Sequence, residues 1–352
     1  MRFGIVCDRL SDVALVAEAE AWGYDFCWAF DSPMLRSNPF VLLALAAERT
    51  ERIRLGVGVA VTGLREAPET ANAIATVNLL APGRTFLGLG TGNTAMRTLG
   101  RRPMRLAPFA RYVKLARTLL AGESALYASS DGEHPVRFQN LESRYVDVSA
   151  AVPVHVGGFG PKAQALAGEL GDGLITGFPR GGSIESARSN VAAGAARAGR
   201  HLDDFQTTGL VNVVMLEPGE TLESPRVVHE CGPSIMANVH YLVDLVRETG
   251  QEPPPYVASI WEEYLAFHAT RESTTAHQKL HESHYTHLDP DEARFVTPEV
   301  IRAFCIAGQP EEMIEQIRER EAAGLDAMVF VAPEDQGERQ YKAFASRVME
   351  KM

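Results

Sequence analysis

Short apolar runs alternate with longer amphipathic stretches along most of the chain. The runs have the near-continuous apolar character of strands that are covered on both faces. Eight such runs can be counted, beginning at Phe3, Tyr24, Ile53, Arg84, Val152, Gly173, Gly209 and Ala327. Eight repeated βα units close more naturally into a (β/α)8 TIM barrel than into an open doubly wound sheet, which usually has fewer strands.

The stretches between the runs carry helix signals. Pro68 and Pro161 stand where first helical turns would begin, a position that tolerates proline. Residues 104–121 and 309–323 place apolar side chains at helical spacing. These signals predict helices between the strands, as repeated βα units require.

Two segments break this alternation. Residues 122–150 are polar and contain Gly, Ser and Asp, and residues 217–300 are far too long for one crossover connection. Both are expected to be insertions on the barrel. No linker or repeat divides the chain, so residues 1–352 are predicted to form a single domain.

Composition and charge exclude several classes of protein. A hydrophobic fraction of 45% and a charged fraction of 22% are typical of a globular fold and argue against disorder. The 34 Lys and Arg residues against 45 Asp and Glu give a net charge of −11, which disfavours nucleic-acid binding. A small-molecule substrate is therefore the expected partner.

The chain lacks signals for export or membrane insertion. Its first residues turn polar after a few positions, and no run approaches 18 apolar residues. The four cysteines are widely spaced and form no CxxC pair, which indicates free buried thiols in a reducing compartment. We expect a cytoplasmic protein with no membrane contact.

Candidate chemistry lies where the predicted strands end, because TIM-barrel sites are built there. Asp31 ends a run of aromatic residues, and it is either a functional group, which we favour, or a cap for the next helix. The GLGTG turn at residues 88–92 lacks the GxGxxG spacing of a dinucleotide site. Its glycines would instead let a flat ring lie close to the backbone, beside Thr91, Gly92 and Asn93.

A second glycine-rich turn, VHVGGFGPK, follows the fifth predicted strand and precedes a helix. Bare amides at a positive helix end can cradle a phosphate, although a tight βα turn would need the same glycines. The expected donors are Gly158, Phe159, Gly160 and Lys162. Gly177 and Phe178 end the next strand and would converge on the same ligand.

Five of the ten histidines fall within residues 268–287. Imidazole is a common metal ligand, but the order of residues nearby is not that of a known metal motif, and we expect no metal. His284 and His287 are candidates to face a substrate, with a solvated histidine face as the alternative. No GxSxG elbow, P-loop or HExxH motif occurs.

Three stretches together resemble the bacterial luciferase-like flavin-dependent oxidoreductases. They are LAPGRTFLGLGTGNTAMRTLGRRP, VPVHVGGFGPKAQALAGELGDGLITGF and GQPEEMIEQIREREAAGLDAMVF. Within that superfamily the chain is similar to the branch that holds methylenetetrahydromethanopterin reductase and the deazaflavin-dependent sugar phosphate dehydrogenases. The resemblance implies a TIM barrel with insertions that binds FMN or coenzyme F420 at the strand ends, in a homodimer.

The resemblance also implies roles for particular residues. Asp31 and Ser32 match a pair beside the cofactor ring, and a cis peptide bond is implied between Gly58 and Val59, against that ring. Gly157, Gly158, Gly160, Gly177 and Phe178 match the phosphate-binding loops. Asn93 stands where sugar phosphate dehydrogenases of the branch carry an acid, so it can orient an oxygen atom but cannot exchange a proton.

The function expected first is a two-component monooxygenase in which a separate flavin reductase supplies reduced FMN and Asp31 and Asn93 serve catalysis. The reaction of reduced FMN with O₂ needs a site that excludes water. The alternative is hydride transfer with coenzyme F420, whose acidic tail needs basic groups, of which only Lys162 and Arg180 stand near the phosphate turn. A third reading is a non-catalytic flavin-binding protein, which a filled ring site would indicate.

Overall fold

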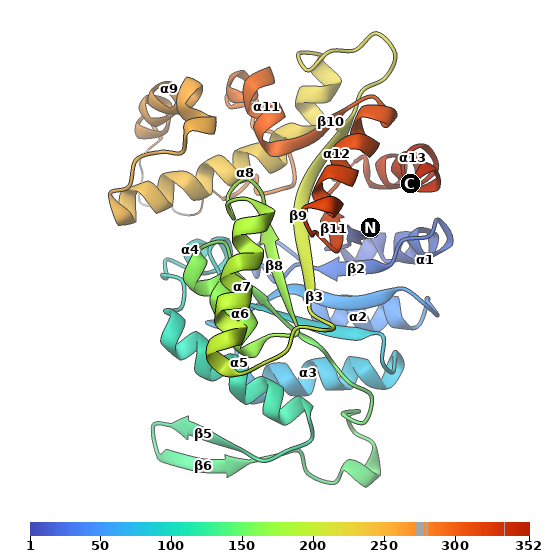
Figure 1. Cartoon of the computed structure of the whole chain (residues 1–352), viewed down its shortest axis with the longest axis vertical. Helices are drawn as coiled ribbons and strands as arrows, with labels where there is room; N and C mark the ends of the chain where they lie inside the picture. Colours follow the sequence, from blue (N-terminus) through green and yellow to red (C-terminus); the bar gives the residue numbers. More distant parts are fainter. Residues whose placement is uncertain (272–277, 279–280, 334) are drawn as a thin grey trace.

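The computed structural model describes residues 1–352 except 272–277, 279–280 and 334. A closed barrel of parallel strands forms its centre and helices surround it, so the predicted TIM barrel is confirmed (Figure 1). Strands pair in the order β9, β11, β1, β2, β3, β4, β7 and β8, and β8 closes the ring against β9. The barrel strands are β1 (Arg2–Val6), β2 (Phe26–Ala29), β3 (Arg54–Val61), β4 (Thr85–Gly90), β7 (Val154–Gly157), β8 (Gly173–Gly177), β9 (Gln206–Met215) and β11 (Ala327–Phe330).

Helices follow most of these strands, as predicted. Pro68 is the second residue of α3 and Pro161 the first of α6, which confirms both proline signals. The periodic stretches 104–121 and 309–323 form α5 and α12. The helices are α1 (Ala14–Ala21), α2 (Pro39–Ala47), α3 (Ala67–Leu80), α4 (Thr94–Thr98), α5 (Leu106–Leu120), α6 (Pro161–Leu170), α7 (Ile184–Ala198), α8 (Pro225–Thr249), α9 (Ala258–Ala269), α11 (Pro298–Phe304), α12 (Pro310–Ala322) and α13 (Gly337–Arg347). Short 3-10 helices are η1 (Leu10–Asp12), η2 (Leu141–Ser143), η3 (Pro255–Val257), η4 (Ala293–Phe295) and η5 (Met349–Lys351).

Large side chains fill the interior of the barrel. Phe26, Trp28 and Phe86 are almost fully buried there and contact one another through their rings. A second and larger apolar layer lies between the barrel and the surrounding helices. The barrel is therefore a packed core, and a ligand can enter only beyond the ends of the strands.

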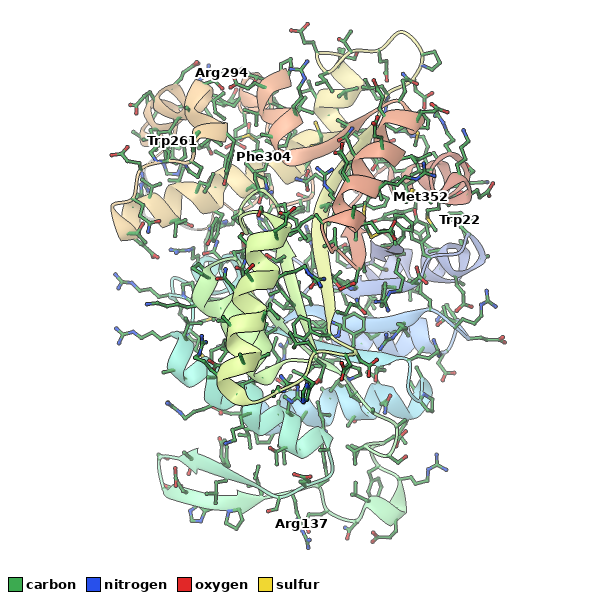
Figure 2. The ribbon with its side chains drawn as sticks, viewed as in Figure 1. Trp22, Arg137, Trp261, Arg294, Phe304 and Met352 are labelled. Atoms are coloured by element: carbon green, nitrogen blue, oxygen red, sulfur yellow. The ribbon has the colours of Figure 1, made fainter. Side chains whose placement is uncertain are left out.

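The first predicted insertion forms an exposed antiparallel hairpin of β5 (Ala125–Ser129) and β6 (Gly132–Val136). The second holds α8 and α9 and packs around a separate apolar cluster that it shares with α11 and that includes Trp261 and Phe304. Figure 2 shows these two residues at the end of the molecule opposite Arg137, which lies beside the hairpin.

The sequence analysis predicted neither the two hairpin strands, β5 and β6, nor a further strand, β10. β10 (Cys305–Gly308) pairs with the outer half of β9, from Asn212 to Met215, while the inner half of β9 belongs to the barrel. β10 has only four residues and begins directly after α11, so no turn residue separates the two elements.

Two further expectations concern the chain as a whole. In the described part of the chain, no helix combines the length and the apolar character needed to cross a membrane. All four cysteines are buried and free, as their spacing predicted.

Candidate active site

A cavity of about 420 Å³ lies at the carboxyl ends of the barrel strands. Its size is within the range of small-molecule sites. Strand ends supply one part of its lining, comprising Phe30, Asp31, Ser32, Gly58, Val59, Gly90, Thr91, Gly92, Asn93, Gly157, Gly158, Phe159, Gly160, Thr176 and Arg180. The second insertion supplies Tyr241, Leu245, Glu248, His284 and Tyr285 on another side. Most of the predicted site residues therefore meet in one place.

Val59 forms the floor of this cavity. The peptide bond between Gly58 and Val59 is cis, as the family resemblance implied, and the pairing of β3 with β4 shifts register at this point. Added Cβ atoms at Gly88, Gly90 and Gly157 would come within 3.3, 2.4 and 3.1 Å of the Val59 methyl groups. Gly88 and Gly90 of the GLGTG turn thus make room for Val59, whereas a Cβ at Gly92 would meet Val61 and Met96; that a flat ring lies beside this turn stays a prediction.

Asp31 is buried and its carboxylate is fully engaged. It accepts the Val61 amide at 2.9 Å, and the two terminal nitrogens of Arg65 bind its oxygens at 2.5 and 3.0 Å. Such a bidentate ion pair holds a carboxylate in one position. The geometry suits a group that joins β2 to β3 at the cavity wall better than one that exchanges protons.

Asn93 lies on the cavity wall at the start of α4, beside Thr91 and Gly92. Its Oδ1 accepts a hydrogen bond from Arg97 Nε at 2.7 Å. Arg97 in turn lies 3.1 Å from Asp244 and 2.8 Å from Glu248, both on α8. Asn93 is therefore connected to the second insertion through one guanidinium group.

The predicted phosphate turn lines the cavity but offers fewer donors than expected. The Gly158 amide already donates to the Ile175 carbonyl at 2.9 Å. A Cβ at Gly158 would lie 2.9 Å from the Ala163 carbonyl carbon, so this glycine lets α6 approach the barrel. The amides of Phe159 and Gly160 remain as candidate donors at the N-terminus of α6.

Four predicted site residues lie outside the cavity lining. Lys162 is exposed on α6, because the first turn of that helix directs its side chain to solvent. Gly177 ends β8, and Phe178 lines a separate cavity of about 310 Å³ beside Ile306 and Arg320. His287 is exposed, with its Nδ1 2.8 Å from the Thr286 hydroxyl.

Arg180, two residues after Phe178, enters the main cavity instead. Its guanidinium carbon lies 3.4 Å from the ring centroid of Phe159 and 4.2 Å from that of Tyr241. Within the described residues Arg180 makes no hydrogen bond or ion pair, and its Nε atom is buried. Burial lowers the pKa of its guanidinium, opposed by the nearby tyrosines, beginning with Tyr285. A partly buried cation without a counter-charge among the described residues is a candidate binding site for an anion.

Thr176 adds a second unpartnered group to this wall. Its Oγ1 is buried and has no hydrogen-bond partner among the residues that the structure describes. The sequence signal for this pair was a lone arginine between the glycines of GFPRGG, the turn that follows β8. The direction in which the Arg180 side chain points depends on the fold.

His284 reaches the cavity from the second insertion. Its Nε2 lies 3.2 Å from the Thr94 hydroxyl, and its Nδ1 is buried without a described partner. Burial, and then the nearby His281 and Arg36, hold the pKa of His284 well below its ordinary value. The imidazole is therefore neutral at physiological pH.

The remaining histidines of the group do not form a metal site in the described residues. No cluster of three or more His, Cys, Asp or Glu side chains there could hold a metal ion. His277 lies outside the described residues.

Comparison with known proteins assigns the family. The sequence model of the luciferase-like monooxygenase family matches residues 11–327. The chain belongs to this family. It is a luciferase-like oxidoreductase, which confirms the resemblance seen in the sequence.

Three relatives within this family are informative. The chain is 29% identical over 321 residues to 5,10-methylenetetrahydromethanopterin reductase of Archaeoglobus fulgidus, covering 90% of this chain and 87% of that one. It is 28% identical over 344 residues to F420-dependent glucose-6-phosphate dehydrogenase of Nocardia farcinica, covering 92% and 88%. The solved coenzyme F420 dependent tetrahydromethanopterin reductase of Methanopyrus kandleri superposes with a TM-score of 0.70 at 22% identity, over 99% of both chains, and shares the fold.

Proposed function

We propose that this protein transfers a hydride between coenzyme F420 and a polar small-molecule substrate. The polar cavity wall carries the proposal, because the buried Thr176 Oγ1 and Arg180 Nε atoms have no partner among the described residues and suit a polar or anionic ligand. A flavin hydroperoxide needs surroundings that exclude water, which this wall does not favour. The relatives that span most of the chain support the deazaflavin alternative. The FMN-dependent monooxygenase that the sequence analysis placed first gains no specific support from them.

The residues present fit such a cofactor. Val59 offers an apolar floor for a flat ring, and the Phe159 and Gly160 amides offer donors for a phosphate. When bound, the deazaflavin supplies the carbon atom that accepts or gives the hydride. The chain's own task is to hold the ring, orient the substrate and manage the accompanying proton.

A basic strip at the edge of the cavity suits the acidic tail of this coenzyme. Arg101, Arg102 and Arg105 are exposed, and they flank Pro103 and Met104, which line the cavity. The sequence analysis counted only two basic groups near the phosphate turn, because these arginines are distant from that turn in sequence and follow β4, the strand that pairs with β7. Local positive charge here offsets the net charge of −11.

His284 is the proposed proton acceptor. If the substrate is an alcohol, its hydroxyl proton would have to leave for a base of the protein. The Thr94 hydroxyl and His284 Nε2 lie 3.2 Å apart, and both residues line the cavity. The proton passes to Nε2 directly or through that hydroxyl, while Asp31 and Asn93 position the walls.

The non-catalytic alternative predicted a site filled by bulky side chains. The cavity of about 420 Å³ does not support that reading. A homodimer stays a prediction, and the F420 proposal requires no separate flavin reductase.

Equilibrium titration tests the cofactor. The purified protein is titrated with coenzyme F420 and with FMN, and binding is followed by cofactor fluorescence. We expect a dissociation constant for F420 at least about tenfold lower than that for FMN, a difference of about 1.4 kcal/mol. Tighter binding of FMN, together with a slowly decaying hydroperoxide absorbance when reduced FMN meets air, would return the monooxygenase to first place.

A further inference from the structure

Three buried imidazoles lie next to one another behind the cavity. The ring centroid of His281 is 6.0 Å from that of His284 and 6.5 Å from that of His240. In all three, the Nδ1 atom is buried and has no hydrogen-bond partner in the described part of the chain. Unpaired buried nitrogens are rare, and three in adjoining rings point to a shared partner other than the side chains that the structure describes.

The Nε2 atoms of two of these rings meet carboxylates. His240 Nε2 lies 2.9 Å from Glu292, and His281 Nε2 lies 3.3 Å from Asp244. Burial raises the pKa of Glu292, but hydrogen bonds from His240 and Tyr264 hold it below its ordinary value, so this carboxylate is an acceptor. A neutral imidazole that donates from Nε2 keeps its lone pair on Nδ1.

The third ring can take the opposite tautomer. The Thr94 hydroxyl can donate to His284 Nε2, which leaves the proton on His284 Nδ1. Two acceptor nitrogens and one N–H donor are then left without a partner among the described residues. A water molecule has two donors and two acceptor sites, and it matches this set with three hydrogen bonds.

We propose that one internal water joins the Nδ1 atoms of His240, His281 and His284 and completes a proton path from the cavity to Asp244. The inference rests on the proposed function for its purpose, although the water site itself does not. His284 lines the cavity in which the substrate would bind, whereas His281 and Asp244 would act through it and are positioning residues.

Proton transfer along this path is balanced at each step. His284 Nε2 takes one proton from the substrate, and His284 Nδ1 releases one to the water. The water passes one proton to His281 Nδ1, and His281 Nε2 releases one to Asp244. The Asp244 Oδ2 atom, which faces His281, is buried, whereas 15% of the Asp244 side-chain surface is accessible, so the carboxyl group would release that proton to solvent on its accessible side.

Charged groups surround the path on every side. Arg97 on α4 lies 3.1 Å from Asp244, and an Arg36 nitrogen donates to the His284 carbonyl at 2.6 Å. Further groups that face the three rings are Arg180, Tyr264, Tyr285 and Glu292. The two arginines nearest His284 disfavour its protonated form, so a proton that arrives there is passed on.

Imidazole NMR on the cofactor-free protein tests the path without a substrate. We expect Nε2–H tautomers for His240 and His281, an Nδ1–H tautomer for His284, and cross-relaxation from their rings to a long-lived water. We also expect exchange of the His284 N–H with solvent to slow by about tenfold or more in His281→Phe, because the path is interrupted. His287→Asn, an exposed histidine of the same segment, is the matched control and leaves that rate unchanged.

His281→Asn keeps a polar side chain and serves as the second variant if the phenylalanine variant does not fold. An unchanged exchange rate in the folded variant, the opposite tautomers, or the absence of a bound water would each overturn the proposal. Failure of F420 to bind in the titration above would overturn the proposed function alone, because the NMR experiment contains no cofactor.

Discussion

Val59 shows how single glycines shape this site. Its methyl groups fill the space that Gly88, Gly90 and Gly157 leave on neighbouring strands, so the position of the cavity floor depends on three residues that have no side chain. Sequence reasoning identified the glycines correctly but assigned their space to a ligand. The contact with Val59 joins three strands, and no local pattern reveals which neighbour occupies a glycine's space.

We therefore expect Gly90→Ala to displace Val59, which forms the floor of the cavity. The new methyl group would lie 2.4 Å from a Val59 methyl, and we expect a loss of about 1–3 kcal/mol in the free energy of unfolding, as for other overpacked cores. F420 binding should weaken in the same variant. Gly160→Ala is the control, because a Cβ there meets nothing within 4 Å and should change stability by less than about 0.5 kcal/mol. Equal denaturant midpoints for the two variants would contradict this account.

Arg180 carries a second prediction at this scale. Arg180→Leu removes an unpaired charge that contacts two rings, so the free energy of unfolding should stay the same or rise. Binding of inorganic phosphate, followed by calorimetry, should weaken by roughly tenfold or more, because a charge-assisted hydrogen bond contributes about 1.5–3 kcal/mol. Arg111→Leu makes the same exchange at an exposed site on α5 and should leave phosphate binding intact. Loss of stability with unchanged binding would show that Arg180 is structural.

At the scale of elements, the alternation of apolar runs was sufficient to predict the barrel, because strands covered on both faces leave a continuous apolar signal. β10 lacked such a signal, since its four residues continue directly from α11. Arg65 was missed for another reason, because its bond to Asp31 spans 34 residues and nothing local marks it. Lys162 and Phe178 were assigned to the site because they stand next to site residues in the sequence, but neither lines the cavity. The direction of a side chain at a strand end depends on the turn that follows.

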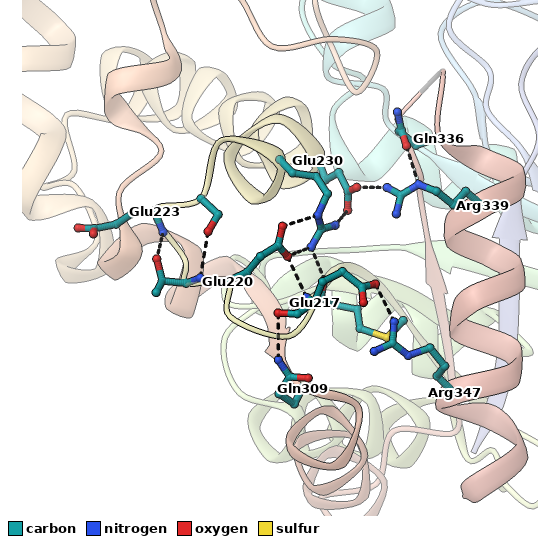
Figure 3. A network of polar contacts seen from close by, with 12 residues as sticks. Glu217, Glu220, Glu223, Glu230, Gln309, Gln336, Arg339 and Arg347 are labelled. Carbon is teal, nitrogen blue, oxygen red and sulfur yellow. Dashed lines mark hydrogen bonds and ion pairs between the residues drawn. The ribbon is translucent and has the colours of Figure 1, made fainter.

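A network of ion pairs attaches the second insertion to the last helix of the chain (Figure 3). Glu230 on α8 is buried and pairs with Arg226 and with Arg339 of α13, and Arg226 also pairs with Glu220. Glu217, just after β9, pairs with Arg347. These contacts connect the segment that carries His284 to the body of the barrel.

Glu220 makes this attachment sensitive to acid. The hydrogen bond from Arg226 lowers the pKa of Glu220 to about 2, from an ordinary value of 4.5. Because the pKa is lower in the folded state, the stabilisation is complete above pH 4.5 and is lost as the pH falls toward 2. At pH 7, Glu220→Gln should cost up to about 1 kcal/mol, as for a partly exposed ion pair.

The measurement is the difference in unfolding free energy between wild type and Glu220→Gln from pH 7 to pH 2, which should shrink toward zero in acid. Glu223→Gln is the control in the same loop, since the Glu223 side chain is exposed and forms no ion pair among the described residues. If the difference in unfolding free energy stayed constant with pH, the Glu220 carboxylate would not contribute to this attachment.

At the scale of the whole molecule, an acidic protein is proposed to bind an acidic cofactor. The net charge of −11 repels a polyanion at long range, so binding depends on the local field of the strip formed by Arg101, Arg102 and Arg105. Salt screens both effects over about 8–10 Å, and the nearer attraction should dominate when the tail is bound. Affinity for F420 should therefore fall as ionic strength rises, even though the protein as a whole is negative.

The double variant Arg102→Gln, Arg105→Gln tests this local field. We expect its dissociation constant for F420 to rise by about three- to tenfold at low salt, as two exposed charge contacts of up to about 1 kcal/mol are lost. The salt dependence should flatten at the same time. The control is the double variant Arg137→Gln, Arg144→Gln, which also removes two positive charges but from the first insertion, at the far end of the molecule (Figure 2). It separates the effect of position from the effect of net charge. Equal weakening in the two double variants would mean that the net charge, rather than the strip, governs affinity, and the basic strip would lose its role in the proposed binding mode.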